Sequence, residues 1–213
     1  MSARQFLASA DADGWRVLWG GGYASTLYRT GSFSVGLALV DAIGKLAGAD
    51  GGQLDVHLRP DVVTVRLSSH GFHGLSERDL HLAGQIAGVA RELGVPADPT
   101  AVHHVQIAID ALVTADVLPF WRAVLGYEQH GEEDLVDPTG RGPSFWFQAM
   151  DAPRPQRNRF HVDLYVPHDQ VEARIAGALA AGGRIVNDTH APDWWTLADA
   201  EGNEVDLAIW LID

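Results

Sequence analysis

The amino-acid sequence predicts an α+β protein with two domains. Its 213 residues are more than one domain of average size needs, and 46% of them are hydrophobic, which suffices for a packed core. Segments whose hydrophobic residues alternate, as in strands, are interspersed with segments of helical spacing along the whole chain. Prolines and polar residues at 95–100 follow a helical pattern, so we expect domains at residues 1–98 and 101–213.

The composition narrows the classes of partner. The formal net charge of −13, without a basic patch, argues against nucleic acid and against anionic membranes. No run approaches the roughly 18 apolar residues of a membrane span, and the first residues lack the apolar segment of a signal peptide. Cysteine is absent, which excludes disulfides, thiolate metal sites and cysteine nucleophiles. We therefore expect a cytoplasmic protein that acts on or binds a small molecule.

The first domain is predicted to combine short strands with two helices. The second helix is the clearest element, because the capping-box sequence Ser76 to Asp79 precedes hydrophobic residues at helical spacing, and Gly94 follows them. The predicted elements are, in order, a hairpin at 15–19 and 24–28 around a glycine triplet, a helix at 35–46, strands at 54–58 and 62–67, and a helix at 77–93.

The second domain is predicted to be an internal duplication. In each copy, an alternating strand leads into a helix that ends at glycine, and short strands follow, so both copies are predicted to be βαβββ units. The first copy has a leading strand at 105–110, a helix at 117–125 and a closing strand at 144–148, and the second has them at 162–166, 169–181 and 204–210.

Four polar side chains occupy matching places in these strands. His104 and His161 are 57 residues apart in the leading segments, and Gln148 and Asp206 are 58 apart in the closing strands. Strand alternation predicts that all four lie on the face turned away from the helices. Two imidazoles, an amide oxygen and a carboxylate can hold a divalent cation and leave room for water or substrate. The same alternation also fits ordinary polar residues on a half-exposed sheet.

The second half resembles the vicinal oxygen chelate superfamily, in its glyoxalase-like branch. The matching segments are HHVQIAI at 103–109, PFW and LGY at 119–127, NRFHVD at 158–163 and LADAEGNE at 197–204. The resemblance implies paired βαβββ modules that form a cleft. It also implies a divalent ion (Zn, Ni, Co, Mn or Fe) held by His104, Gln148, His161 and Asp206, with Asp206 standing where metal-binding members usually have glutamate.

This resemblance leaves more than one function open. It implies a metal-dependent isomerase, lyase or dioxygenase that acts on a small oxygenated substrate. The alternative is a metal-free protein that binds a small molecule or an antibiotic, as relatives that have lost the metal do. Before the last hairpin, His190, Trp194 and Trp195 are candidates for an aromatic wall over the cleft, although tryptophans in such strands also serve as core residues.

The first half resembles pterin-4a-carbinolamine dehydratase. The matching segments are Gly14-Trp15, residues 33–47, VTVRLSSH at 63–70 and GLSERD at 74–79. The resemblance implies an antiparallel sheet with helices on one face, and a pterin as ligand or substrate. The family's His-His-Pro triplet falls here on Gly52, Gln53 and Leu54, so the paired histidines are missing and the domain is expected to be degenerate.

Gln53, His70 and Asp79 are the candidate catalytic residues of this dehydratase-like pocket. Dehydration of a carbinolamine needs groups that titrate near neutral pH, and glutamine does not titrate. Asp79 is equally explained as a member of the helix cap. We therefore expect ligand binding or dimerisation, with 4a-hydroxytetrahydrobiopterin dehydratase activity as a further alternative. A homodimer is expected because members of both families commonly self-associate.

Overall fold

The computed structural model describes residues 1–18, 22–48, 53–68, 74–153 and 161–209, although the side chain of Gln53 is not among the described parts. The chain forms two compact units, Met1–His104 and Val105–Asp213, which are treated separately below as the first and second unit. Among the described residues, no helix is both long enough and apolar enough to cross a membrane.

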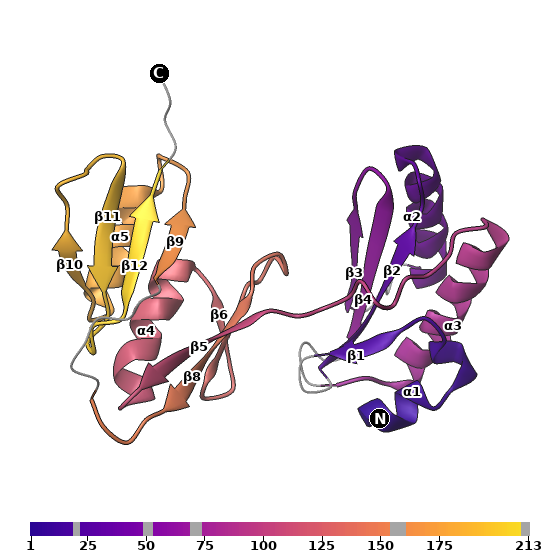
Figure 1. The fold of residues 1–213 in the computed structure, drawn as a ribbon, viewed down its shortest axis with the longest axis horizontal. Coiled ribbons are helices and arrows are strands. Elements are labelled where there is room, and N and C mark those ends of the chain that lie inside the picture. Colours follow the sequence, from indigo (N-terminus) through magenta and orange to yellow (C-terminus); the bar gives the residue numbers. More distant parts are fainter. Residues whose placement is uncertain (19–21, 49–52, 69–73, 154–160, 210–213) are drawn as a thin grey trace. The chain divides into compact units, whose positions relative to one another are not determined.

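The first unit is an antiparallel sheet in the order β1-β2-β4-β3, covered by helices (Figure 1). Its strands are β1 (Arg16–Leu18), β2 (Tyr23–Arg29), β3 (Gln53–Leu58) and β4 (Val62–Ser68). Its helices are the short α1 (Ala3–Leu7), a 3-10 turn at Ala10–Ala12, α2 (Phe33–Ala47) and α3 (Glu77–Glu92). The two long helices lie on one face of the sheet, which confirms the predicted architecture.

The hydrophobic spacing that predicts these helices also determines what they bury. Leu39 and Ile43 of α2 are fully buried, as is Ile86 of α3, and they belong to the same core as Val63 and Val65 of β4. Each helix therefore turns its apolar stripe onto the sheet and leaves its polar face to solvent. The capping box of α3 forms as expected, since the Ser76 hydroxyl accepts a hydrogen bond from the backbone N–H of the N3 residue.

The second unit consists of two βαβββ modules, as predicted. The first contains β5 (Gln106–Ala111), α4 (Thr114–Leu125), β6 (Glu128–His130), β7 (Asp134–Val136) and β8 (Ser144–Ala149). The second contains β9 (Val162–Tyr165), α5 (Val171–Ala180), β10 (Arg184–Asn187), β11 (Trp194–Ala198) and β12 (Glu204–Ala208). Their sheets have the orders β5-β8-β7-β6 and β10-β11-β12-β9. In each, the leading and closing strands pair in parallel.

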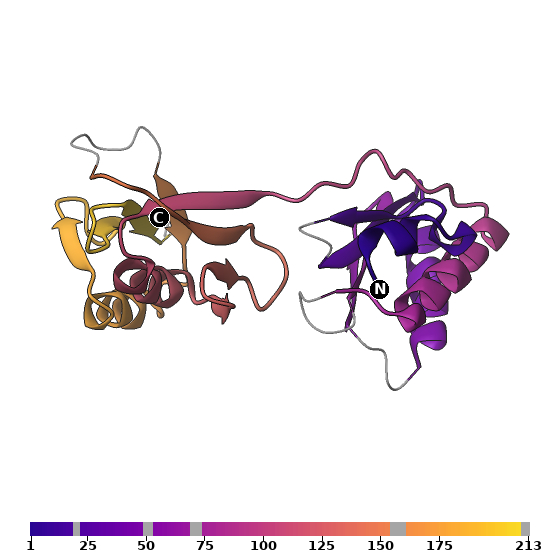
Figure 2. The ribbon, with the colours of Figure 1, turned by 90° about the horizontal axis from the view of Figure 1, so that it is seen from below.

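One hydrophobic core serves both modules of the second unit. Phe120 and Trp121 of α4, Phe145 of β8 and Leu207 of β12 are buried in the same cluster. Figure 2 shows α4 and α5 side by side on one side of the unit. Gly183 makes this packing close, because a Cβ at that position would lie 2.3 Å from the Phe120 ring. The opposite faces of both sheets are consequently free to carry polar side chains.

The leading strand of the first module begins one residue later than its sequence pattern predicts. It begins at Gln106, which pairs with Ser144, so His104 precedes it. Pro143 immediately precedes β8. Because proline has no backbone N–H, it cannot donate a hydrogen bond that would extend the pairing of β8 with β5. Val105 is 56% exposed, although its alternation with Ile107 and Ile109 predicts an inward side chain.

Candidate metal-binding site

A histidine and two aspartates converge on the sheet of the second module. The Nε2 atom of His161 lies 3.2 Å from Asp163 Oδ1 and 3.4 Å from Asp206 Oδ2. One nitrogen or oxygen atom from each of the three residues lies within 4.8 Å of those of the other two. Metal ligands in proteins gather in this way because a single ion contacts all of them.

Strand register brings these side chains together. Asp163 and Asp206 are direct partners in the parallel pairing of β9 with β12, and His161 immediately precedes β9. Val205 and Leu207 flank Asp206 and are fully buried, so Asp206 lies on the other face of the strand. Alternation therefore separates the buried hydrophobic face from the polar face on which the cluster lies.

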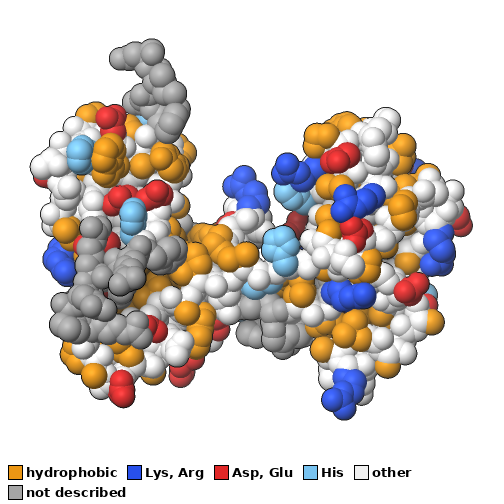
Figure 3. Space-filling view, viewed as in Figure 1, with side chains coloured by type: hydrophobic (Ala, Val, Ile, Leu, Met, Phe, Trp, Pro, Cys, Tyr) orange, Lys and Arg blue, Asp and Glu red, His pale blue; other side chains and the backbone are white. Residues whose placement is uncertain are grey.

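The cluster is open to solvent. The side chains of His161, Asp163 and Asp206 retain 44%, 58% and 21% of their exposure. Figure 3 shows histidine and acidic side chains close to one another on the visible face of the second unit. An ion held here would have coordination positions left for water or substrate, which is the arrangement of a catalytic rather than a structural metal site.

Thr196 orients Asp206, the least exposed member of the cluster. Its hydroxyl donates a hydrogen bond of 2.6 Å to Asp206 Oδ1, and the two residues are direct partners in the pairing of β11 with β12. Oδ1 is thus engaged with the neighbouring strand, while Oδ2 is the oxygen nearest to His161. A hydrogen bond to a carboxylate of this kind sets the direction of its second oxygen.

The donor set fits a divalent transition ion. Two carboxylates and one imidazole supply a nitrogen and hard oxygen ligands, and the two negative charges compensate the charge of the ion. Two of the four predicted ligands, His161 and Asp206, are in this cluster. Asp163, the third member, is not among the four predicted residues, although strand alternation places it on the same face as His161.

Gln148 lies in the first module, and its position along the β5–β8 pair differs from that of Asp206 along the β9–β12 pair. It is opposite Asp110, near the end of β5, whereas Asp206 is opposite Asp163, near the start of β9. Its side chain is exposed. Gln148 and Asp206 are separated by nearly the same number of residues as His104 and His161, but they do not occupy equivalent positions in their strand pairs. The role of Gln148 as a ligand stays a prediction.

His104 is part of the first unit, where it contacts Tyr23. Its Nδ1 atom is 2.9 Å from the Tyr23 hydroxyl, and the two rings meet edge to face with centroids 5.8 Å apart. Arg66 lies over the ring of this tyrosine, with its guanidinium carbon 4.4 Å from the ring centroid. Burial, and secondarily the positive charge of Arg66, lowers the pKa of His104. Its role as a metal ligand stays a prediction.

Aromatic side chains lie beside the cluster on the same face. The rings of His190 and Trp194 stack with centroids 4.0 Å apart and an angle of 14° between planes. Trp194 shares its face with Thr196, two residues along β11, and Tyr165 shares its face with Asp163, two residues along β9. Tyr165 is 57% exposed. The neighbouring Trp195 instead packs against the hydrophobic core.

The dehydratase-like candidates are described only in part. His70 and the side chain of Gln53 lie outside the described residues. Asp79 is buried at 6% exposure, and its Oδ2 atom accepts hydrogen bonds of 2.7 Å from the Ser76 N–H and 2.8 Å from the Ser76 hydroxyl. This carboxylate therefore completes the cap of α3. Its catalytic role stays a prediction.

Two family models match the chain in succession. The model for pterin 4 alpha carbinolamine dehydratase matches residues 1–89, and that for the glyoxalase-like domain matches residues 106–208. A curated protein of Nocardia farcinica (strain IFM 10152), named "Putative pterin-4-alpha-carbinolamine dehydratase", is 42% identical over 60 residues, which are 28% of this chain and 63% of that protein. The chain thus spans less than two thirds of this relative's length.

Solved structures resemble the second half. One is a glyoxalase/bleomycin resistance protein/dioxygenase family enzyme from Burkholderia phytofirmans PsJN, with 16% identity, a TM-score of 0.37 and coverage of 50% of this chain and 97% of the other. Another is a glyoxalase/bleomycin resistance protein from Albidiferax ferrireducens T118, with 18% identity, a TM-score of 0.38 and coverage of 52% and 98%. By the two family models, the chain contains a pterin-4a-carbinolamine dehydratase-like domain at residues 1–89 followed by a glyoxalase-like domain at residues 106–208.

Proposed function

We propose that the second unit binds a divalent metal ion through His161, Asp163 and Asp206 and uses it in a reaction of a small oxygenated substrate. The observation that carries this proposal is the convergence of one imidazole and two carboxylates within 4.8 Å on an accessible sheet face. The match to the glyoxalase-like domain supports it, because Asp163 and Asp206 lie on the strands that lead and close the second module, and His161 immediately precedes the leading strand.

The residues of the chain have separate tasks in this proposal. His161 supplies a neutral nitrogen ligand, and the two aspartates supply the negative charge that makes a divalent ion favourable here. Thr196 holds Asp206 in one orientation. When bound, the ion supplies Lewis-acid chemistry, which polarises a carbonyl or stabilises an enolate. The exposure of His161 and Asp163 leaves the substrate access to the site.

The aromatic side chains suggest what the substrate carries besides oxygen. Side chains two residues apart on a strand are about 7 Å apart, so Trp194 lies within the length of a small molecule from Thr196. The stacked rings of His190 and Trp194 offer a flat, rigid surface. Together with the exposed Tyr165, they favour a substrate with a planar, conjugated group next to its oxygens.

Metal analysis of the full chain tests the proposal. After loading with Zn, Ni, Co, Mn or Fe and removal of free ion, we expect about one tightly held ion per chain for at least one metal. His161→Ala, Asp163→Asn and Asp206→Asn should each weaken binding strongly. His168→Ala and Asp151→Asn, which change exposed residues of the same types in the same unit, should not.

Two results would contradict the proposal. If no metal is retained under any loading condition, the second unit does not form an ion site, and a metal-free small-molecule binding protein becomes the better description. If metal is retained equally by the three ligand variants and the two control variants, the ion binds elsewhere on the chain.

A further inference from the structure

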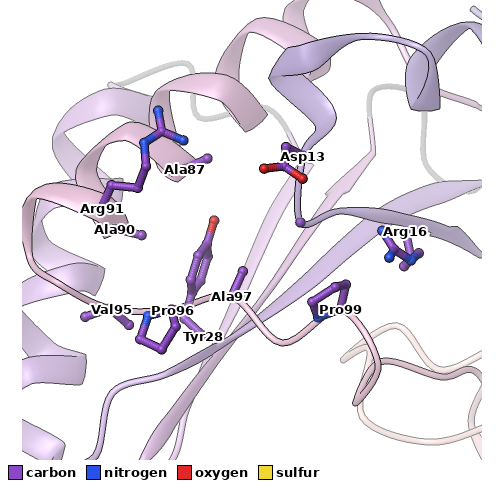
Figure 4. A pocket seen from close by; sticks show the side chains of 11 residues that line it. Asp13, Arg16, Tyr28, Ala87, Ala90, Arg91, Val95, Pro96, Ala97 and Pro99 are labelled. Carbon is purple, nitrogen blue, oxygen red and sulfur yellow. The ribbon is translucent and has the colours of Figure 1, made fainter.

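We propose that the first unit contains a second small-molecule site, which binds a small organic carboxylate with an amino or hydroxyl group. The site is a pocket of about 300 Å³ at the carboxyl-terminal end of α3 (Figure 4). Its walls come from α3, from residues 95–99 that follow it, from residues 13–16 and from Tyr28 of β2. This volume is at the lower end of the range of ligand pockets and therefore suits a small molecule.

Two arginines make the pocket attractive to an anion. Arg16 and Arg91 both line it, from different walls. In the described part of the chain, neither guanidinium has a carboxylate within ion-pair distance, whereas Arg29 is engaged by Asp98 at 2.6 Å. Among the described residues, the one hydrogen bond that the Arg16 side chain donates goes to the Trp15 carbonyl. Guanidinium groups bind carboxylates with two parallel hydrogen bonds, which gives both strength and orientation.

Tyr28 adds a neutral hydrogen-bond donor. The residue is 2% exposed, and Figure 4 shows its hydroxyl directed into the space between Arg91 and Asp13. Burial raises the pKa of Tyr28 to about 12, although the Thr26 hydroxyl and the Arg91 charge act in the opposite direction. The phenol therefore keeps its proton at neutral pH.

The remaining lining selects an organic anion over an inorganic one. Ala87, Ala90, Val95, Pro96 and Ala97 give the pocket an apolar wall, against which a hydrocarbon group is removed from water. Asp13, on the other side, offers a carboxylate that accepts hydrogen bonds from an amino or hydroxyl group and disfavours a highly charged anion. Inorganic phosphate would use the arginines but neither of these features.

Backbone contacts hold the walls in place without a ligand. The Arg29 N–H donates to the Pro96 carbonyl, and the Asp98 N–H donates to the Leu27 carbonyl, so residues 96–98 run along the edge of β2. Gly14 lies against this segment, since a Cβ on it would be 3.0 Å from the Ala97 Cβ. A pocket already formed in this way avoids an ordering cost on binding.

The pocket is separate from the other candidate sites of the chain. Asp79 lies in the first turn of α3 and Arg91 in the last, which puts about 18 Å of helix between them at about 1.5 Å per residue. The metal-binding residues belong to the second unit. The carboxylate site therefore does not depend on the proposed metal function, and either can fail without the other.

Ligand titration of the full chain tests this inference. The probes are short α-amino, α-hydroxy and plain monocarboxylates, the methyl ester of each, and inorganic phosphate, followed by calorimetry or by shifts of backbone NMR signals. We expect saturable binding of an amino or hydroxy acid, with little binding of its ester. Arg16→Gln and Arg91→Gln should each weaken it about ten-fold or more, and Tyr28→Phe by less.

Arg59→Gln, an exposed arginine in the turn after β3, is the matched control and should leave binding unchanged, as should His161→Ala. Circular dichroism confirms that each variant is folded. The inference is wrong if no carboxylate binds, if binding survives in the variant that lacks both Arg16 and Arg91, or if phosphate competes as well as the acids do.

Discussion

A single hydroxyl determines how one metal ligand is presented at the proposed ion site. Thr196 is 7% exposed, and its short hydrogen bond to Asp206 joins neighbouring strands on the polar face of the sheet. Without it, Asp206 would keep its charge but lose the contact that orients it. In the proposed ion site, the role of Thr196 is thus to position Asp206 and not to bind the ion.

Replacing Thr196 by valine is therefore expected to weaken metal binding about 10-fold to 100-fold, which is typical when an outer hydrogen bond to a ligand is lost. Valine keeps the shape and the strand preference of threonine, so the fold should persist. Thr189→Val, at an exposed threonine of the same unit, is the control. Unchanged affinity in calorimetric metal titration of Thr196→Val would show that Asp206 needs no such support.

The surroundings of Asp137 shift the pKa of its carboxyl group. Its carboxylate accepts hydrogen bonds of 2.8 to 2.9 Å from the backbone N–H groups of Thr139, Arg141 and Gly142, and others from the Thr139 hydroxyl. Partial burial alone would raise the pKa of Asp137, but these hydrogen bonds together bring it below the usual 3.8. The ionised carboxylate therefore stabilises the loop between β7 and β8.

This predicts how stability depends on pH. A folded-state pKa below the unfolded value means that the contribution of Asp137 is complete above about pH 5 and is lost as pH falls through 3.8 and then through the lower folded value. The difference in free energy of unfolding between the wild type and Asp137→Asn should shrink over that range. Urea unfolding at about pH 7, 5 and 3 measures it, and a difference that grows on acidification would contradict the assignment.

At the scale of elements, α4 begins without a capping residue of its own. Its N-cap is Val113, whose side chain makes no capping hydrogen bond. The carboxylate of Glu201, in the turn between β11 and β12, instead accepts hydrogen bonds of 2.8 to 2.9 Å from the N–H groups of Leu112 and Val113, immediately before the helix. A negative charge there also favours the helix dipole. One module thus caps the helix of the other.

Glu201→Ala should accordingly lower the free energy of unfolding by about 0.5–2 kcal/mol, the usual effect of losing a helix cap. Glu132→Ala, in the exposed turn between β6 and β7, changes the same residue type without touching a helix and should have a much smaller effect. Chemical denaturation of the full chain measures both. Equal stability of the two variants would mean that water replaces Glu201 at no cost.

At the scale of the whole molecule, the two units have separate hydrophobic cores. One core contains residues from Phe6 to Val95, and the other contains residues from Ile109 to Ile209. A ligand stabilises the unit that binds it, by about 2.7 kcal/mol when its concentration is one hundred times its Kd. The proposed ion and the proposed carboxylate should therefore protect different parts of the chain.

Hydrogen exchange of the full chain, read by mass spectrometry of its peptides, checks this expectation. Metal should slow exchange in β9 and β12, and the carboxylate should slow exchange in α3 and in residues 95–99. Exchange in the other unit should change little in each case. Protection by the metal centred on α3 would contradict the assignment of the ion to the second unit.

The local patterns of the sequence were enough to predict most elements. The capping box placed the start of α3 correctly, and the alternation predicted at 144–148 and 204–210 identified both closing strands, which form β8 and β12. The start of α4 was predicted too late, because Thr114 to Asp116 carry no hydrophobic signal and the cap that starts the helix comes from Glu201, far along the chain.

The sequence by itself determined the class of the fold, the duplication of the βαβββ unit and the face of each strand, because hydrophobic periodicity is a local property. The tertiary structure decided which polar residues meet. Asp163 joins His161 and Asp206 because β9 and β12 pair in parallel with that register, and Gln148 is at another level because β5 and β8 pair with a different one. Register between strands far apart in the chain depends on the packing of the whole sheet, and no spacing within either strand encodes it.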